Sequence, residues 1–253
     1  MNDITTMRLL PRTANQRCLP VRRMSSTGNH MSLKAQLDEC RRAFEASTAP
    51  GIVVAVQRSV AELVQMGLVR QAVKAGEKAP LFRLRSDTGE FVALSEALGR
   101  GPVVVSFFRG GWCPFCRLEL QALAEAHPEI ERLGATLIAL SPQARGESAS
   151  LGSGCEPPFP ILRDPGCKIA SRYRVAFTIP HQFRSAYLEL SYPNSTKAKS
   201  WLLPIPATYV LDSSGFVVLS YLDADHTTRL EPIEIIAALT HLRAANIPER
   251  NNR

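Results

Sequence analysis

The order of the predicted elements indicates an α/β fold with a mixed central sheet and helices on both of its faces. Between residues 103 and 173, apolar runs of strand length alternate with amphipathic stretches of helix length. Such alternation requires parallel strands joined by crossover helices. Near the end of the chain, two more apolar runs are joined by Asp212-Ser213-Ser214-Gly215. This hairpin signal adds antiparallel strands to the sheet.

Two helices are expected ahead of the sheet, as a helical leader over residues 31–75. The first spans about residues 33–46, where apolar side chains recur at helical spacing. The Ala-Pro-Gly at 49–51 breaks this helix, and a second helix is expected over residues 59–75. These helices either cover the main domain or support a homodimer.

The main domain is predicted over residues 76–247, and residues 248–253 form a tail. Its elements follow from apolar runs, turn signals and helical periodicity. In chain order they are a small hairpin (81–84 and 91–94), a helical turn (95–98), a strand (103–108), a helix (117–131), a strand (136–140), a helix (145–151), a strand (159–162), a helix that ends at 173, an irregular surface insertion (176–204), a hairpin (207–211 and 216–221) and a helix (232–245). The last helix is expected to bury Ile233, Ile236, Leu239 and Leu242.

Charge and composition argue against a nucleic-acid partner and against a membrane partner. The chain has 253 residues and a net charge of +7, and the five arginines of residues 1–30, against Asp3 alone, supply more than half of that charge. The rest of the chain has no stripe of Lys and Arg interleaved with aromatics, and no apolar run is long enough to span a membrane. Residues 1–30 are predicted to be a disordered basic extension, a mitochondrial targeting segment, or the result of a start codon upstream of the true one.

Cysteine usage indicates a reducing compartment. The chain has six cysteines, which is too sparse for a disulfide framework, and its start has no apolar segment typical of a secretory signal. We therefore expect a cytoplasmic protein, or one of the mitochondrial matrix if residues 1–30 are a presequence. Nucleotide-binding and serine-nucleophile motifs do not occur, and no cofactor is expected.

The most informative segment is Arg109-Gly110-Gly111-Trp112-Cys113-Pro114-Phe115-Cys116. It joins a buried strand to a helix, so one helical turn separates the two sulfurs. Cys113 would lie where the helix dipole favours a negative charge. In such motifs the thiol pKa falls from about 8.5 to roughly 3.5–7.5, and the thiolate is both nucleophile and leaving group. The segment therefore predicts redox chemistry.

The other residues of this segment suit that chemistry. Pro114 fits the first helical turn, where its missing N–H costs nothing. Gly110 and Gly111 permit a close approach of the backbone to a substrate. Trp112 is expected to form an apolar wall at the thiol, and Arg109 to favour the thiolate or to steer a peroxide oxygen.

Other candidate sites are weaker. Two close cysteines can be half of a zinc site, but Cys155 and Cys167 are the only further candidates and their spacing is unsuitable, so no metal is expected. Either of them is an alternative resolving cysteine or an incidental one. Pro206 directly precedes a buried strand and is a candidate cis proline. His226 is expected in a polar loop without a partner.

Residues 107–120, Phe-Phe-Arg-Gly-Gly-Trp-Cys-Pro-Phe-Cys-Arg-Leu-Glu-Leu, resemble the active-site segment of peroxiredoxin-like proteins. These proteins belong to the alkyl hydroperoxide reductase/thiol-specific antioxidant branch of the thioredoxin-like superfamily. Residues 79–82, 159–165 and 208–215 also resemble landmarks of that family. The resemblance covers roughly residues 76–245 and implies a thioredoxin-like fold with an N-terminal hairpin, in agreement with the predicted element order.

The resemblance implies that Cys113 is the peroxidatic nucleophile and Cys116 the resolving cysteine. It also implies a peroxide substrate and recycling by thioredoxin or a similar dithiol. Two positions depart from the family pattern. Gly110 stands where the family usually has Thr or Ser. Pro206 stands where the family usually has Arg, and it matches the proline of thioredoxins instead. Arg109 is a candidate replacement for that arginine.

We therefore expect an enzyme, a thiol-dependent peroxidase that reduces hydrogen peroxide and organic hydroperoxides through a Cys113–Cys116 dithiol/disulfide. Two alternatives remain open from the sequence. The first is a thioredoxin-like disulfide reductase, and the second is a non-enzymatic redox sensor whose disulfide switches a partner surface.

Overall fold

A mixed five-stranded sheet forms the centre of the protein. The computed structural model describes residues 31–143, 157–190, 192 and 201–245. The strands lie in the order β5-β4-β3-β8-β9; β3, β4 and β5 are parallel, and β8 and β9 are antiparallel to their neighbours. Their bounds are β3 Val103–Phe107, β4 Thr136–Ser141, β5 Ile161–Arg163, β8 Ala207–Leu211 and β9 Val217–Leu222. The predicted α/β fold with a mixed sheet is confirmed.

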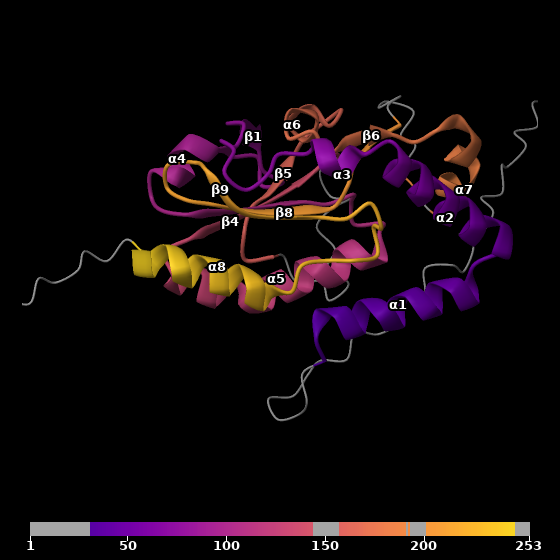
Figure 1. The fold of residues 1–253 in the computed structure, drawn as a ribbon, viewed down its shortest axis with the longest axis horizontal. Coiled ribbons are helices and arrows are strands. Elements are labelled where there is room, and N and C mark those ends of the chain that lie inside the picture. Colours follow the sequence, from indigo (N-terminus) through magenta and orange to yellow (C-terminus); the bar gives the residue numbers. More distant parts are fainter. Residues whose placement is uncertain (1–30, 144–156, 191, 193–200, 246–253) are drawn as a thin grey trace, which may run out of the picture.

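Helices cover both faces of this sheet (Figure 1). On one face lie α1 (Leu33–Ser47), α5 (Pro114–Arg132) and α8 (Pro232–Ala245). On the other lie α4 (Leu94–Leu98), α6 (Lys168–Arg172) and the hairpin of β1 (Arg83–Arg85) and β2 (Phe91–Ala93). The central strand β3 is buried along its whole length, because its side chains alternate between the two apolar layers.

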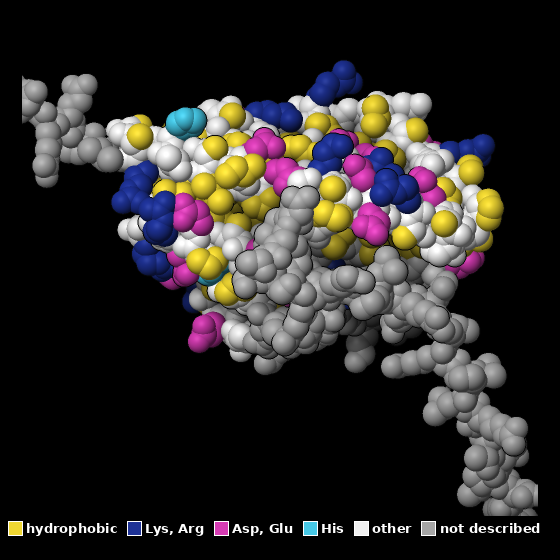
Figure 2. Space-filling view, turned by 90° about the horizontal axis from the view of Figure 1, so that it is seen from below, with side chains coloured by type: hydrophobic (Ala, Val, Ile, Leu, Met, Phe, Trp, Pro, Cys, Tyr) yellow, Lys and Arg dark blue, Asp and Glu magenta, His cyan; other side chains and the backbone are white. Residues whose placement is uncertain are grey.

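The surface on the side of α1, α5 and α8 carries charges of both signs. Basic and acidic side chains lie next to one another there, with apolar side chains between them (Figure 2). None of the helices within the described ranges has the length and apolar character that crossing a bilayer requires.

The second helix of the leader differs from its prediction. It forms α2 (Pro50–Gln65), and a short helix α3 (Leu68–Gln71) follows it. Pro50 starts α2 instead of only ending the helix before it, because a proline in the first turn has no N–H bond to lose. Gly67, with a left-handed φ of 65°, separates α2 from α3.

The described part of the segment predicted as an irregular insertion, residues 176–190, 192 and 201–204, is largely regular secondary structure, so the prediction was wrong there. It contains β6 (Ala176–Thr178), a 3-10 turn η1 (His181–Phe183), α7 (Arg184–Glu189) and β7 (Leu202–Pro204). β6 and β7 pair in an antiparallel ribbon. With α2 this ribbon encloses a third apolar cluster, whose buried members include Leu63, Phe177, Ile179, Tyr187 and Leu203. Burial against the leader therefore stabilises a segment whose strands are only three residues long.

The buried face of the last helix also needed correction. In α8 the buried side chains include Ile235 and Leu239, whereas Ile233 is 65% exposed. The predicted helix over 145–151 lies outside the described residues.

Candidate active site

The two cysteines of the redox motif lie where β3 ends and α5 begins. Cys113 is the N-cap residue of α5, and its backbone N–H donates to the carbonyl of Gly110 at 3.1 Å. Pro114 is the first residue of the helix, as predicted, and Cys116 lies within the first turn. Both cysteines are buried and both are free thiols, so the structure represents the reduced protein.

The electrostatics of the pair distinguish one sulfur from the other. Burial opposes ionisation of Cys113, but hydrogen bonds from Cys116 and the positive charges of Arg109 and Arg229 outweigh it and lower its pKa to about 6. For Cys116, burial, the hydrogen bond to Cys113 and the negative charge of Cys113 together raise the pKa well above 9. Near neutral pH, Cys113 is therefore a thiolate and Cys116 is a thiol that donates to it.

Arg109 supplies a buried positive charge beside the motif. Its guanidinium carbon lies 4.8 Å from the centre of the Trp112 ring and 5.2 Å from that of Tyr187. No carboxylate of the described residues pairs with Arg109, and its Nε has no hydrogen-bond partner there. A buried cation without a carboxylate favours an anion nearby, and the thiolate of Cys113 meets that requirement.

A second buried arginine, Arg229, contacts the motif from the loop between β9 and α8, although no sequence pattern pointed to it. Its Nη2 donates to Cys116 Sγ at 3.1 Å, and its Nε donates to Glu119 Oε2. Glu119 also accepts from the hydroxyls of Ser106 and Thr208, each at 3.4 Å. Burial and the neighbouring Cys116 raise the pKa of Glu119 to about 7 against the opposing charge of Arg229. One sequence signal existed for Glu119, since it lies three residues after Cys116 on the buried face of an amphipathic helix.

His226 lies at the site and contacts a neighbouring side chain. The prediction that it has no partner was therefore wrong. Its ring packs edge-on against Phe115, with the ring centres 5.7 Å apart. Burial and the charges of Arg109, Arg229 and Arg41 lower its pKa well below the ordinary value, so the ring is neutral at neutral pH.

The peptide bond before Pro206 does not have the cis geometry that the sequence suggests. No peptide bond of the described residues is cis, so the bond before Pro206 is trans. Pro206 nevertheless lies at the site, because it lines a narrow cavity with Arg109 and His226. Val60 and Leu63 of α2, Phe177 of β6 and Ile205, which directly follows β7, also line this cavity.

The backbone at Gly110 explains the departure from the family pattern. Its φ is 143°, and a Cβ at this position would overlap the side-chain amide of Gln143 and approach Trp112 Nε1 at 2.7 Å. Gln143 is buried two residues after the end of β4, and its Oε1 accepts the backbone N–H of Gly111. A threonine at position 110 would therefore meet both strain and a filled space.

Cys167 does not join this site. Cys167 is buried in the apolar layer on the opposite face of the sheet, where burial raises its pKa to about 12. Cys155 lies outside the described residues. Within the ranges that the structure describes, no group of three His, Cys, Asp or Glu side chains is arranged to hold a metal ion.

Comparisons with known proteins identify related sequences. A family model described as "AhpC/TSA family" matches residues 75–220. A peroxiredoxin Q of rice is 28% identical over 149 residues, which are 59% of each chain, so the match spans less than two thirds of that relative. A peroxiredoxin Q of wheat is 25% identical over 209 residues, covering 81% of this chain and 87% of the wheat protein.

Solved structures give the same fold. The crystal structure of peroxidoxin BcpB from Mycobacterium tuberculosis superposes with a TM-score of 0.53 at 21% identity, covering 68% of this chain and 97% of the other. The peroxiredoxin 6 of Arenicola marina superposes with the same TM-score at 20% identity, covering 69% and 76% of the two chains. Because the family match covers more than half of the chain and includes the whole Cys113–Cys116 segment, this protein belongs to the AhpC/TSA family.

Proposed function

We propose that the protein is a thiol-dependent peroxidase that reduces hydrogen peroxide and organic hydroperoxides through Cys113 and Cys116. The observation that carries this proposal is a pair of buried free thiols at the start of α5, beside the charges of Arg109 and Arg229, which help to lower the pKa of Cys113 to about 6. Relatives named peroxiredoxin Q and the membership of the AhpC/TSA family support it.

The first half of the cycle consumes the peroxide. The thiolate of Cys113 attacks one peroxide oxygen, so an S–O bond forms while the O–O bond breaks. The other oxygen leaves as hydroxide or alkoxide and takes up a proton to give water or an alcohol. Arg109 is positioned to stabilise the charge that develops on these oxygens, because its Nε is a buried donor without a partner among the described residues.

The second half restores the thiols. Cys116 attacks the sulfenic sulfur of Cys113, forming the S–S bond and releasing the sulfenic oxygen as water. A reduced thioredoxin or a similar dithiol then reduces the disulfide by exchange. Both cysteine residues are at most 1% exposed, which favours a small peroxide over a protein disulfide as the first oxidant. Reduction by a protein dithiol therefore requires the turn before α5 to move.

A coupled assay tests this proposal. Oxidation of NADPH through thioredoxin reductase and thioredoxin is followed after peroxide is added to the full chain. We expect turnover by the wild-type protein and by Cys167→Ser, whose cysteine is buried on the far face of the sheet. Cys113→Ser should be inactive, and Cys116→Ser should be oxidised once and then hold a sulfenic acid that a dimedone probe labels.

Two outcomes would contradict the peroxidase proposal. A wild-type protein that ignores peroxide but reduces insulin disulfides would be a disulfide reductase. A protein that does neither, but forms its disulfide reversibly with a chemical oxidant, would be a redox sensor. Normal turnover by Cys116→Ser would assign the resolving role to another thiol.

Location and assembly belong to the same proposal. The plant relatives are named chloroplastic, and for this chain we propose a reducing compartment. That compartment is the cytoplasm, or the mitochondrial matrix if residues 1–30 act as a presequence. Imaging of a C-terminal fluorescent fusion, with and without residues 1–30, tests this. A homodimer is also proposed, and light scattering of the purified full chain measures it.

A further inference from the structure

The loop between β9 and α8 is built by its own aspartates. Asp223 accepts the backbone N–H of Asp225 at 2.8 Å. Asp225 in turn accepts the backbone N–H and the hydroxyl of Thr227, at 2.9 and 2.7 Å. These side-chain-to-backbone bonds replace the ladder bonds that the chain loses at the end of β9. The loop therefore has a defined shape, which directs His226 and Arg229 toward the active site.

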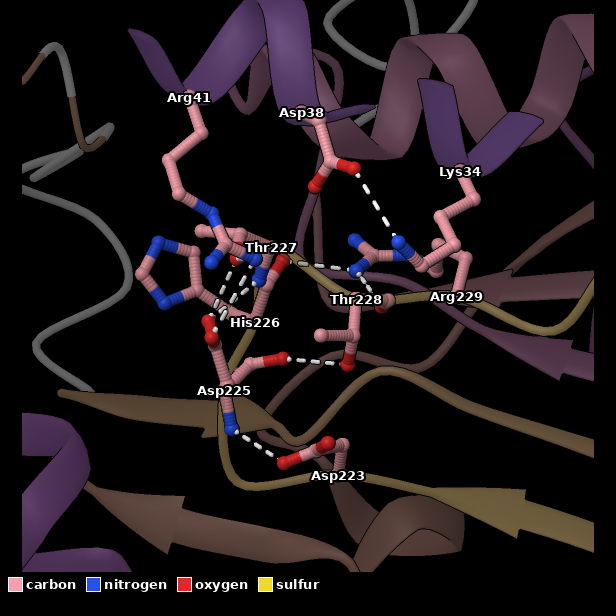
Figure 3. A network of polar contacts seen from close by, with 9 residues as sticks. All are labelled: Lys34, Asp38, Arg41, Asp223, Asp225, His226, Thr227, Thr228 and Arg229. Carbon is pink, nitrogen blue, oxygen red and sulfur yellow. Dashed lines mark hydrogen bonds and ion pairs between the residues drawn. The ribbon is translucent and has the colours of Figure 1, made fainter. Parts of the chain in front are cut away.

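Helix α1 holds this loop at two places, and Figure 3 shows the first of them, at Arg41. Arg41 donates to the hydroxyl of Thr227, and its guanidinium lies 3.5 Å from the Asp225 carboxylate. At the other end of the loop, Glu231 accepts the first free backbone N–H groups of α1, those of Leu33 and Lys34, at 3.2 and 2.7 Å. The leader helix is thus in direct contact with the segment that carries Arg229.

Arg229 is fixed by four groups at once. Its Nη1 donates to the carbonyls of His226 and Thr228, at 2.7 and 2.5 Å, and its Nε donates to Glu119. Its Nη2 donates to Cys116 Sγ at 3.1 Å, and its side chain is 1% exposed. A rigid guanidinium therefore faces the second sulfur of the motif and has no freedom to turn away from it.

We propose that Arg229 stabilises Cys116 as a thiolate in the resolving step, and that Arg41 of α1 positions the loop that carries Arg229. This inference rests on the proposed peroxidase cycle. Cys116 must lose its proton before it can attack the sulfenic sulfur of Cys113. In that step the S–S bond forms, the S–O bond breaks, and the departing hydroxide takes up the proton that Cys116 released, giving water. A buried thiolate needs a charged donor at contact distance, and Nη2 of Arg229 is in that place.

The proposed roles of Arg41 and Arg229 are distinct. Arg229 touches a reacting sulfur, whereas Arg41 acts only through Asp225 and Thr227. Loss of Arg41 should therefore slow the step that needs Cys116 and leave the reaction of Cys113 with small reagents unchanged. A merely structural role would instead lower stability without separating the two cysteines.

The test measures, without any peroxide, the attack of Cys116 on the sulfur of Cys113 while that sulfur carries a leaving group. Cys113 is first converted to a mixed disulfide with thionitrobenzoate, and the release of the coloured leaving group by Cys116 is then timed. Compared with wild type, we expect release to be about 10-fold slower or more in Arg229→Met, since a hydrogen bond to a charged group is lost. Arg41→Met should be slower by a smaller factor, on the order of 3-fold.

The matched control is Lys34→Met on the same helix. Lys34 makes its ion pair with Asp38 within α1 and sends no side-chain bond to the loop (Figure 3). This variant should release the leaving group at the wild-type rate. Arg229→Lys, which keeps a charge without the fixed fork, should fall between wild type and Arg229→Met.

Wild-type release rates in both Arg229→Met and Arg41→Met would overturn the inference. Because Arg41 is half-exposed, its variant keeps the test valid even if Arg229→Met does not fold. Slow release in these variants supports the inference whether or not the protein consumes peroxide. Failure of the peroxidase proposal is seen separately, as an inert wild-type protein in the coupled assay.

Discussion

Removing the charge of Arg109 should change the ionisation of Cys113. At a pKa of about 6, roughly nine-tenths of Cys113 is thiolate at pH 7, against about one-hundredth for a thiol at 9.0. Loss of a nearby opposite charge is expected to raise a pKa by about 1–3 units. In Arg109→Met the thiolate fraction at pH 7 should therefore fall to between about one-half and about one-hundredth. Each unit corresponds to about 1.4 kcal/mol less stabilisation of the thiolate.

The assay is the pH dependence of alkylation of Cys113 by iodoacetamide, with the modified peptide quantified by mass spectrometry. The midpoint should move from about pH 6 upward by the same 1–3 units. Arg109→Lys should shift it less, because the charge remains. Arg132→Met is the matched control, since Arg132 lies in the last turn of the same helix, exposed and paired with Glu129. A midpoint that stays at the wild-type value in Arg109→Met would refute the role given to this arginine.

Three further variants test the surroundings of the motif. Glu119 has a pKa raised to about 7, so ionising it costs native stability as the pH rises from about 4.5 to 7. Urea titrations measure the difference in the free energy of unfolding between wild type and Glu119→Gln. As the pH rises from about 4.5 to 7, wild type should lose about 3 kcal/mol relative to the variant. A difference that does not change with pH would contradict this. Gly110→Ser should lose about 1–3 kcal/mol because of its left-handed φ. Gly110→Ser should cost less free energy of unfolding in a protein that also carries Gln143→Ala, which removes the overlapping side chain. A double-mutant cycle measures this difference. Leu37→Ala, in the buried face of α1, should cost about 2–5 kcal/mol, and an exposed-residue control, Lys34→Ala, should cost almost nothing.

Much of the fold follows from local pattern. The apolar run at 103–108 and the turn at 212–215 identify a central strand and a hairpin, because burial on both faces and tight reversal each leave a signature within a few residues. The ribbon of β6 and β7 leaves no such signature. Its strands have three residues each, pair Ala176 with Pro204, and owe their stability to packing against α2. Long-range pairing of short strands cannot be recognised from periodicity.

The same distinction applies to the helix faces. In α8 the chain order places Ile233, Ile235 and Ile236 close together, so periodicity alone allows more than one buried face. The structure buries Ile235 and exposes Ile233 because the sheet and α5 contact only one side of the helix. Tertiary contact therefore decided a choice that the sequence left open.

By itself, the sequence determined the α/β fold class and the position of the two reactive sulfurs, because both depend on residues that are neighbours in the chain. Only the tertiary structure decided what controls those sulfurs. Arg229 lies 113 residues from Cys116 and Gln143 lies 32 residues from Gly111, yet both make hydrogen bonds at the motif. The pKa of a thiol depends on the charges, donors and burial around it in space. No local pattern can show which distant side chains the folded chain brings there.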